Sequence, residues 1–374
     1  IVVYAKNSDY LSAHKAYHGL PLSEERIAAY TNPDHDPHGP WSTNPWKAAV
    51  GRGGTTYCIT TPTGRQYTET WYGNRETFNV YLAEGRVHWT DNGDGLPRIK
   101  IYLSESKKEG QAAINFFTHD KFGCNQDASS EVEHLMGKKG YFDNPKPTTL
   151  IRALCMLASN EDSVILDFFS GSATTAHAVM QLNAEDGGNR KFIMVQLPET
   201  CGESTEAAKA GYKNICEIGK ERIRRAGEKI KAEIEEQNAQ LKLGEEPKKV
   251  PDIGFKVFKL DSSNLKQWQP DYDDLEATLF DSISNYVEGR SELDVVYEIM
   301  LKMGMELTWP LETHTIGGKN AYEIGMGALM ICLDDQITTE VAEGMAALYK
   351  ELAPETWRVV FKDNGFADDS AKVN

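Results

Sequence analysis

Asp167-Phe168-Phe169-Ser170-Gly171-Ser172-Ala173-Thr174-Thr175 is the stretch that decides the fold of this chain. It overlaps the end of a continuous apolar run, 163–169, which is typical of a buried strand, and it leads into residues 174–182, whose apolar positions have helical spacing. A strand-to-helix turn made of small residues lets the backbone approach a ligand closely. The first turn of the helix then offers unpaired N–H groups to that ligand. The stretch therefore indicates a ligand-binding loop in an α/β fold.

The segments on either side extend this pattern. After a polar turn at 183–189, residues 191–197 form a second apolar run, and strand, helix and strand in this order predict a βαβ unit with parallel strands. Residues 148–159 are predicted to be helical, and 214–237 form a strongly charged amphipathic helix. The basic run in that helix is interpreted as a solvated face rather than a DNA contact; it comprises Lys220, Arg222, Arg224 and Arg225.

The two ends of the chain differ from this central part in their expected secondary structure. Residues 1–5 read as a buried strand, 30–54 as an extended loop rich in Pro, Gly and Asn, and 57–100 as short strands and hairpins, one of them at 86–89. After a linker at 244–251, we expect a strand over 254–260 and an acidic, mostly helical domain from about 272. The fold class is therefore α/β with a β-rich insert and an α+β C-terminal domain.

Charge is distributed unevenly along the chain. Its 374 residues have a net charge of -16. Residues 1–150 hold 16 Lys and Arg against 17 Asp and Glu, whereas 251–374 hold 10 against 23. The nearly neutral first part can bind phosphates through local clusters of Lys and Arg, but electrostatic steering would be modest. Charge alone neither establishes nor excludes DNA binding.

The composition favours a particular cellular compartment and argues against a metal site. No apolar run approaches the roughly 20 residues that span a bilayer. The six cysteines form no CxxC pair, which favours reduced thiols in a cytoplasm over a zinc site or a disulfide framework. His35 and His38 lie close together in a loop, but the sequence suggests no third or fourth ligand, so no metal site is expected.

Nucleotide-binding motifs of other classes are missing. The chain has no G-x-G-x-x-G of the dehydrogenase type and no G-x-x-x-x-G-K of the P-loop type. A nicotinamide oxidoreductase is therefore disfavoured.

Asp-x-Phe-x-Gly-x-x-Thr at 167–174 resembles the S-adenosylmethionine-binding loop of amino-DNA methyltransferases, although Ala173 stands where the usual pattern has a second glycine. Phe142-Asp143-Asn144-Pro145-Lys146-Pro147-Thr148 resembles the segment of that family called motif X, which covers the methionine end of the cofactor. By the same resemblance, an acceptor at the end of strand 191–197 would hold the ribose hydroxyls, with Gln196 or Glu199 in that role. The resemblance implies S-adenosylmethionine as cofactor and these binding residues: Lys146, Pro147, Thr148, Asp167, Phe168, Phe169, Gly171, Ser172, Thr174, Gln196 and Glu199.

A closer resemblance links the whole chain to the methyltransferase (Mod) subunits of type III restriction–modification systems. It rests on Tyr30-x-Asn-Pro-Asp-x-Asp-Pro-x-Gly-Pro-Trp41, on Ile59-Thr-Thr-Pro-x-Gly64, on Asn183-Ala-Glu-Asp-Gly-Gly-Asn-Arg190, on 254–263 and on 360–366. In such enzymes the cofactor motifs follow the target-recognition region, which is the permuted order of the β class. The resemblance implies a Rossmann-like methyltransferase core in 1–27 and 141–250, a target-recognition region in 28–140 and a C-terminal dimerisation or partner-docking domain in 251–374.

The catalytic tetrapeptide of this family, Asp-Pro-Pro-Tyr or a close variant, is absent, because no Pro-Pro dipeptide occurs in the sequence. In the family its aromatic ring stacks on a flipped-out base and its acceptors hold the exocyclic amine. We expect it to lie before residue 1, so no catalytic residue is assigned within the chain. The expected activity is site-specific adenine-N6 methylation of DNA, with cytosine-N4 transfer still open; the alternative is an inactive DNA-recognition and dimerisation fragment.

The resemblance also names partners: double-stranded DNA, a second copy of the chain and a restriction (Res) helicase-nuclease subunit. Arginine reads guanine edges and lysine mostly meets phosphates, so the candidate DNA contacts are basic residues of the recognition region. They are Arg52, Arg65, Arg75, Arg86, Arg98, Lys100, Lys107 and Lys108. Trp41, Trp71 and Trp89 are candidates for stacking on bases, although aromatic residues in a β-rich insert are more often core.

Overall fold

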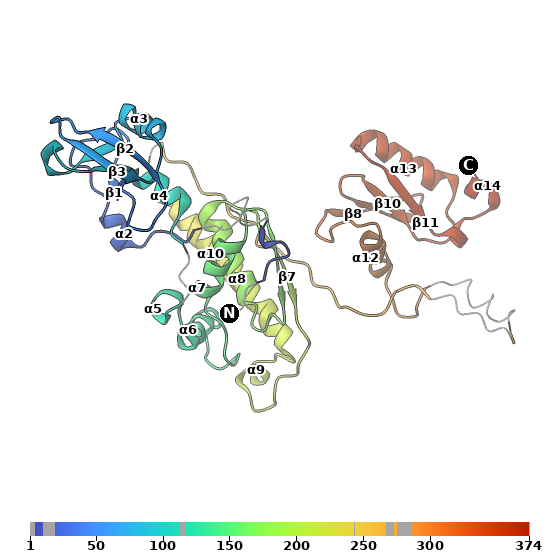
Figure 1. Ribbon diagram of the computed structural model, residues 1–374. Helices are drawn as coiled ribbons and strands as arrows, with labels where there is room; N and C mark the ends of the chain where they lie inside the picture. Colours follow the sequence, from blue (N-terminus) through green and yellow to red (C-terminus); the bar gives the residue numbers. More distant parts are fainter. Residues whose placement is uncertain are drawn as a thin grey trace. The chain divides into compact units, whose positions relative to one another are not determined.

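The computed structural model describes residues 4–9, 19–112, 117–242, 244–266, 273–274 and 286–373. The chain divides into two compact units, Ile1–Gly254 and Phe255–Asn374. Figure 1 colours the first from blue to yellow and the second mainly brown to red. No helix in the part of the chain that the structure describes combines the length and the apolar character that crossing a membrane requires.

The first half of the first unit is built mostly from antiparallel strands. β1 (Trp41–Pro45), β5 (Pro97–Tyr102) and β4 (Val87–Trp89) form one sheet, and β2 (Thr55–Thr60) pairs with β3 (Gln66–Trp71). Trp46, Trp71 and Phe78 are buried in the core of this region. Among the described residues of this half, the helical elements are α2 (Glu24–Ala28), α3 (Arg75–Ala83), η1 (Asp91–Gly93), α4 (Leu103–Glu109) and α5 (His119–Phe122).

Two expectations for this region are wrong in detail. Strand β1 lies inside 30–54, which was expected to be extended loop, because it pairs with β5 in a register that ends at Pro45 opposite Arg98. Helix α3 lies inside 57–100, where strands and hairpins were expected, and it begins where the Asn74 side chain accepts a hydrogen bond from the Thr77 N–H. The expected strand at 1–5 falls mainly outside the described residues, and Tyr4 and Ala5 lie in no strand.

The second half of the first unit contains the βαβ unit. β6 (Val164–Phe168) and β7 (Lys191–Val195) pair in parallel, and α8 (Thr174–Asp186) connects them. α6 (Asn125–Met136), α7 (Thr148–Ala158), α9 (Glu206–Lys209) and α10 (Ile215–Ala239) complete this half. α8 packs against α7, α10 and β7 (Figure 1). Val179 and Leu182 of α8 pack between α7 and the inner face of the two strands. The outer face of the two strands is apolar and exposed: Val164, Leu166 and Ile193 are 57%, 60% and 51% exposed.

The second unit is a four-stranded sheet covered by helices. The strand order is β11 (Arg358–Phe361), β10 (Leu329–Cys332), β9 (Lys319–Ile324) and β8 (Leu311–Ile316), with β10 and β11 parallel. α12 (Glu292–Lys302) packs on one set of alternating strand residues and α13 (Thr339–Leu352) on the other. η2 (Asp363–Gly365) and α14 (Asp369–Val373) follow β11. The described residues of this unit are thus less helical than expected, and 254–260 is not a strand.

Candidate cofactor site

The loop between β6 and α8 is fixed to the end of β7. The backbone N–H groups of Phe169 and Ser170 both donate to the carbonyl oxygen of Val195, at 2.9 and 3.0 Å. The Thr175 hydroxyl, at the start of α8, donates to the Asp167 carboxylate over 2.6 Å. The strand end, the loop and the first helical turn therefore form one closed arrangement.

Positive φ angles give the loop its sharp turn. Phe169, Gly171 and Ala173 have φ values of 69°, 54° and 59°. The left-handed region is open to glycine but costs other residues about 1–2 kcal/mol. Ala173 directly precedes α8 in this conformation, which explains physically why glycine is the usual residue at this position in the family pattern.

The structure brings 142–148 against this loop. A Cβ atom added to Gly171 would lie 3.1 Å from Cζ of Phe142, so glycine permits the close approach. The Thr174 hydroxyl donates to the carbonyl oxygen of Lys146 over 3.1 Å. The two segments expected to flank one cofactor are therefore neighbours in space.

The two acceptor candidates after β7 have different surroundings. The Gln196 side-chain oxygen accepts a hydrogen bond from the Gly171 N–H over 2.7 Å, and its amide nitrogen donates to the Leu197 carbonyl. Gln196 therefore holds the loop, whereas Glu199 is exposed. Of the two, Glu199 has the carboxylate that is open to a ligand.

The sequence missed three polar residues behind the loop: Glu131, His177 and Arg222. Arg222 is 1% exposed, and its Nη1 donates to the hydroxyls of Ser172 and Thr174 over 2.8 and 2.9 Å. The interpretation of the basic run as a solvated face is therefore wrong for this residue. A signal existed, because Arg222 lies four residues after Ile218 and four before Ala226, both buried on one helix face.

Burial controls the protonation of these groups. The pKa of His177 is lowered to about 3, first by burial and then by the nearby charges of Arg222, Lys229 and Arg152. Burial also lowers the pKa of Arg222 to about 10, and the Glu131 carboxylate opposes this effect. Near neutral pH, His177 is thus uncharged and Arg222 is charged.

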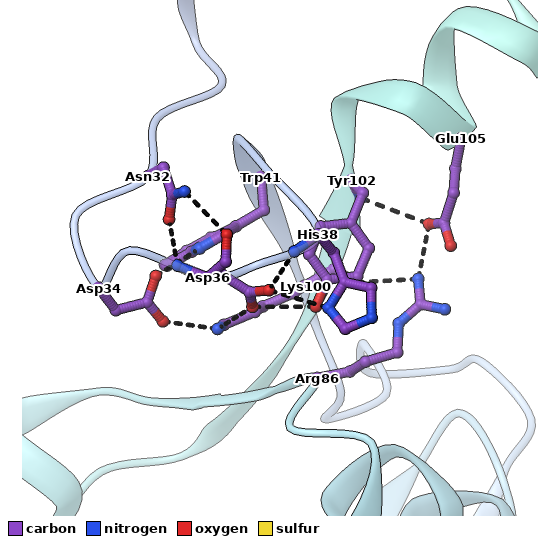
Figure 2. A network of polar contacts seen from close by, with 9 residues as sticks. All are labelled: Asn32, Asp34, Asp36, His38, Trp41, Arg86, Lys100, Tyr102 and Glu105. Carbon is purple, nitrogen blue, oxygen red and sulfur yellow. Dashed lines mark hydrogen bonds and ion pairs between the residues drawn. The ribbon is translucent and has the colours of Figure 1, made fainter.

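In the first half of the unit, several candidate DNA-contacting residues are engaged within the protein. Lys100 is 5% exposed, and its ammonium lies 2.5 Å from Asp34 and 2.6 Å from Asp36. Figure 2 shows it enclosed by the loop that carries both aspartates, beside Arg86, which is paired with Glu105 at 2.6 Å.

The remaining candidate DNA-contacting residues differ in their exposure and in their bonds within the protein. Arg98 donates to Thr43 and Arg75 to the Cys58 carbonyl, whereas the exposed Arg65 pairs with Asp94 at 3.1 Å. Arg52, Lys107 and Lys108 are exposed. Trp71 is fully buried and Trp41 nearly so, while Trp89 packs partly buried at the edge of the same core as Trp71.

Histidines do not form a shared site in the Asn32–Trp41 loop. His38 Nδ1 lies 3.0 Å from Asp36, and His35 is exposed. Among the described residues, one group of side chains has the spacing of metal ligands, Glu312, His314 and Glu323 on β8 and β9. His314 Nε2 and Glu323 are already hydrogen-bonded at 2.8 Å, and Glu312 is exposed.

A family model described as DNA methylase matches residues 1–250, which include the whole loop, motif X and both strands. The chain belongs to the DNA methylase family. N6 DNA methyltransferases of this family use S-adenosylmethionine.

Three proteins of similar sequence are named as Mod subunits of type III restriction-modification enzymes. The chain is 37% identical over 263 residues to the Mod subunit of the type III restriction-modification enzyme StyLTI of Salmonella typhimurium, a match covering 69% of this chain and 37% of that protein. It is 28% identical over 309 residues to the EcoP15I Mod subunit of Escherichia coli, covering 79% and 41%. A third relative, the EcoPI Mod subunit of Escherichia phage P1, is 45% identical over 96 residues, covering 26% and 15%. The first two matches span about two fifths of the relatives' own length.

The residues of this DNA methylase loop fit the chemical groups of S-adenosylmethionine. Phe168 and Phe169 are each 63% exposed and offer apolar surface to an adenine ring. The carboxylates of Asp167 and Glu199 suit the ammonium and hydroxyl groups of this cofactor, and the cation of the exposed Lys146 suits its methionine carboxylate.

Proposed function

We propose that this chain is part of a type III Mod subunit that methylates adenine N6 at a specific DNA site, with S-adenosylmethionine as methyl donor. The observation that carries the proposal is the joint packing of 142–148 and 167–175 in a chain of the DNA methylase family. The relatives named as Mod subunits extend the similarity beyond the cofactor motifs.

The proposed core is Rossmann-like, in the permuted order of the β class. Parallel β6 and β7 with α8 between them form one βαβ unit of such a core. The exposed apolar face of these strands supports a further layer packed on it, because parallel sheets are normally covered on both faces. We propose that residues outside this sequence supply that cover and the Asp-Pro-Pro-Tyr-like tetrapeptide.

S-adenosylmethionine, when bound, supplies an activated methyl group. Asp167 is proposed to bind the cofactor at the carboxyl end of β6, where Thr175 orients its carboxylate. Gln196 holds the Gly171 N–H, so that the loop keeps its turn when the ligand enters. Lys146, at the exposed edge of motif X, is proposed to meet the methionine carboxylate.

Residues 28–140 are proposed to recognise the DNA site. The exposed Arg52, Lys107 and Lys108 are the members of the candidate set best placed for phosphate contact. Lys100 and Arg86 are better suited to holding the recognition region together, since their charges are paired inside it. For 251–374 we propose subunit pairing and docking of a Res subunit, in a cytoplasmic enzyme.

Titration calorimetry with S-adenosylhomocysteine tests the cofactor assignment. Asp167→Ala removes a carboxylate proposed to accept a charge-assisted hydrogen bond, and such bonds contribute about 1.5–3 kcal/mol. The affinity should fall by roughly 10- to 100-fold. Asp167→Asn keeps an acceptor for the Thr175 hydroxyl and separates the loss of charge from the loss of loop structure.

Asp162→Ala is the matched control, because Asp162 is an exposed aspartate just before β6. Its affinity should equal that of the unaltered chain. Unchanged affinity in both Asp167 variants would contradict the assignment of this loop to the cofactor.

A further inference from the structure

An ionic link between the buried Arg222 and the partly exposed Glu131 joins the cofactor loop to motif X through helices α6 and α10. On the loop side, Nη1 of Arg222 donates to the hydroxyls of Ser172 and Thr174 over 2.8 and 2.9 Å. On the other side, Nη2 of Arg222 lies 3.7 Å from Oε2 of Glu131. Arg222 is thus held between a neutral hydroxyl pair and a carboxylate.

Glu131 continues the link to the start of α7. Its two carboxylate oxygens accept hydrogen bonds from the backbone N–H and the hydroxyl of Thr148, at 3.1 and 3.0 Å. A second route runs through Thr174, which accepts from Arg222 and donates to the Lys146 carbonyl over 3.1 Å. Both routes end in Lys146-Pro147-Thr148.

A contribution to stability does not explain why a buried arginine occupies this position. The Nε and Nη2 groups of Arg222 have no hydrogen-bond partner among the described residues, although the side chain is 1% exposed. Burying a guanidinium with unused donors is unfavourable, and buried ion pairs are often replaceable by apolar residues without loss of stability. What the arginine provides is a fixed connection between two separate segments.

We propose that Arg222 and Glu131 are positioning residues that set the spacing between Ser172–Thr174 and Lys146–Thr148, the two walls of the cofactor site. This inference rests on the proposed function, which assigns both segments to S-adenosylmethionine. With the link broken, each wall keeps its own fold but the two no longer hold the methionine part of the ligand together.

The test compares two ligands on the full 374-residue chain. S-adenosylhomocysteine carries the amino-acid part of the cofactor, whereas 5′-methylthioadenosine lacks it. Arg222→Met should weaken S-adenosylhomocysteine binding at least tenfold and change 5′-methylthioadenosine binding by less than twofold. Arg222→Lys, which keeps the charge but cannot span both partners, should fall between Arg222→Met and the unaltered chain.

Three further variants separate positioning from folding. Arg224→Met lies on the same helix with a 57% exposed side chain and should bind both ligands normally. Glu131→Gln removes the carboxylate from the other end of the link. In the double variant with Arg222→Met, the loss of S-adenosylhomocysteine affinity should be smaller than the product of the two single losses, because one link is broken in either case.

The outcomes are distinguishable. If the unaltered chain binds neither ligand, the proposed function fails. If it binds both, but Arg222→Met binds like the unaltered chain or loses both ligands equally, the positioning role is overturned. Should Arg222→Met fail to fold, Glu131→Gln and Thr174→Val cut the same link, and normal S-adenosylhomocysteine binding in both would overturn the inference.

Discussion

His177 shows, at the scale of a single residue, what the interior behind the cofactor loop does to a titratable group. It is 7% exposed, and its Nδ1 has no hydrogen-bond partner within the described part of the chain. Burial, with the charge of Arg222 next in importance, lowers its pKa to about 3. His177 therefore binds a proton near pH 6.5 in the unfolded chain, but only at much lower pH in the folded chain.

This difference predicts a pH-dependent stability. The neutral His177 is fully compatible with the fold above the unfolded pKa of about 6.5, and stability is lost as pH falls from there toward the folded pKa of about 3. Between pH 7 and pH 5 the first unit should lose about 2 kcal/mol more in the unaltered chain than in His177→Asn. Urea unfolding at the two pH values measures this difference.

His35→Asn provides the comparison, because His35 is an exposed histidine of the same unit. It should lose stability with pH as the unaltered chain does. A His177→Asn variant with an unchanged pH dependence would show that His177 binds its proton at the same pH in the folded and the unfolded chain.

Single charged residues mark the limit of prediction from the sequence. Lys100 was expected to contact DNA and Arg222 to face solvent, yet both are buried. Their partners lie far along the chain: Asp36 is 64 residues from Lys100, and Ser172 is 50 from Arg222. A local pattern of charges carries no information about such partners, so burial of these cations follows only from the folded arrangement.

At the scale of elements, prediction succeeded where local pattern and tertiary packing agree. The apolar run 163–169 contains β6, and 174–182 forms the first part of α8. α8 extends through Asp186, into the turn expected at 183–189, and is followed by Gly187, whose φ is 75°. α3 could not be distinguished by its apolar pattern, since a single residue of it, Phe78, is buried.

The loop Asn32–Trp41 is held in place by a buried charge, that of Lys100. Asn32 accepts from and donates to the backbone of Asp36, at 2.7 and 3.0 Å, and Trp41 donates to Asp34 over 2.8 Å (Figure 2). The hydrogen bond from the Lys100 ammonium holds the pKa of Asp36 well below its ordinary range. The loop is thus anchored to β5 through Lys100 and through the Tyr102 hydroxyl, which donates to Asp36 over 3.0 Å.

Lys100→Met should therefore destabilise the first unit, because it leaves two aspartates facing each other without their cation. Surface ion pairs contribute on the order of 0.5 kcal/mol, whereas removing one partner of a buried pair is several times more harmful. The urea midpoint should fall clearly further than in Arg65→Met, which breaks the exposed pair with Asp94. Equal midpoints for the two variants would mean that the loop does not need Lys100.

At the scale of the whole molecule, the acidic charge and the methylase signature occupy different parts. The family match ends at residue 250, and the second unit starts at Phe255. Residues 251–374 hold 10 basic against 23 acidic side chains, which makes them a poor DNA surface. The sequence predicted a domain boundary near residue 251, but the four-stranded sheet of the second unit depends on non-local pairing that periodicity does not reveal.

The open face of β6 and β7 predicts a property of the isolated chain. Leu166 and Ile193 are 60% and 51% exposed on adjacent strands, so a dye such as anilinonaphthalene sulfonate should bind there. Replacing both by serine should at least halve the dye fluorescence and leave the melting temperature nearly unchanged.

Leu301→Ser tests whether the signal comes from this face, since Leu301 is 60% exposed on α12 in the second unit. It should leave the fluorescence as it was. Undiminished fluorescence in the double serine variant would mean that other residues of the chain already cover the two strands.

The anchored loop of Figure 2 has a thermodynamic consequence for whatever it contacts. Its backbone is ordered by Asn32, Asp34, Asp36 and Lys100 before any partner arrives. A partner therefore meets a preorganised surface, and little conformational entropy remains to be lost on association. The exposed side chain of His35, which takes no part in the network of Figure 2, can then be exchanged to alter what is bound while the loop keeps its shape.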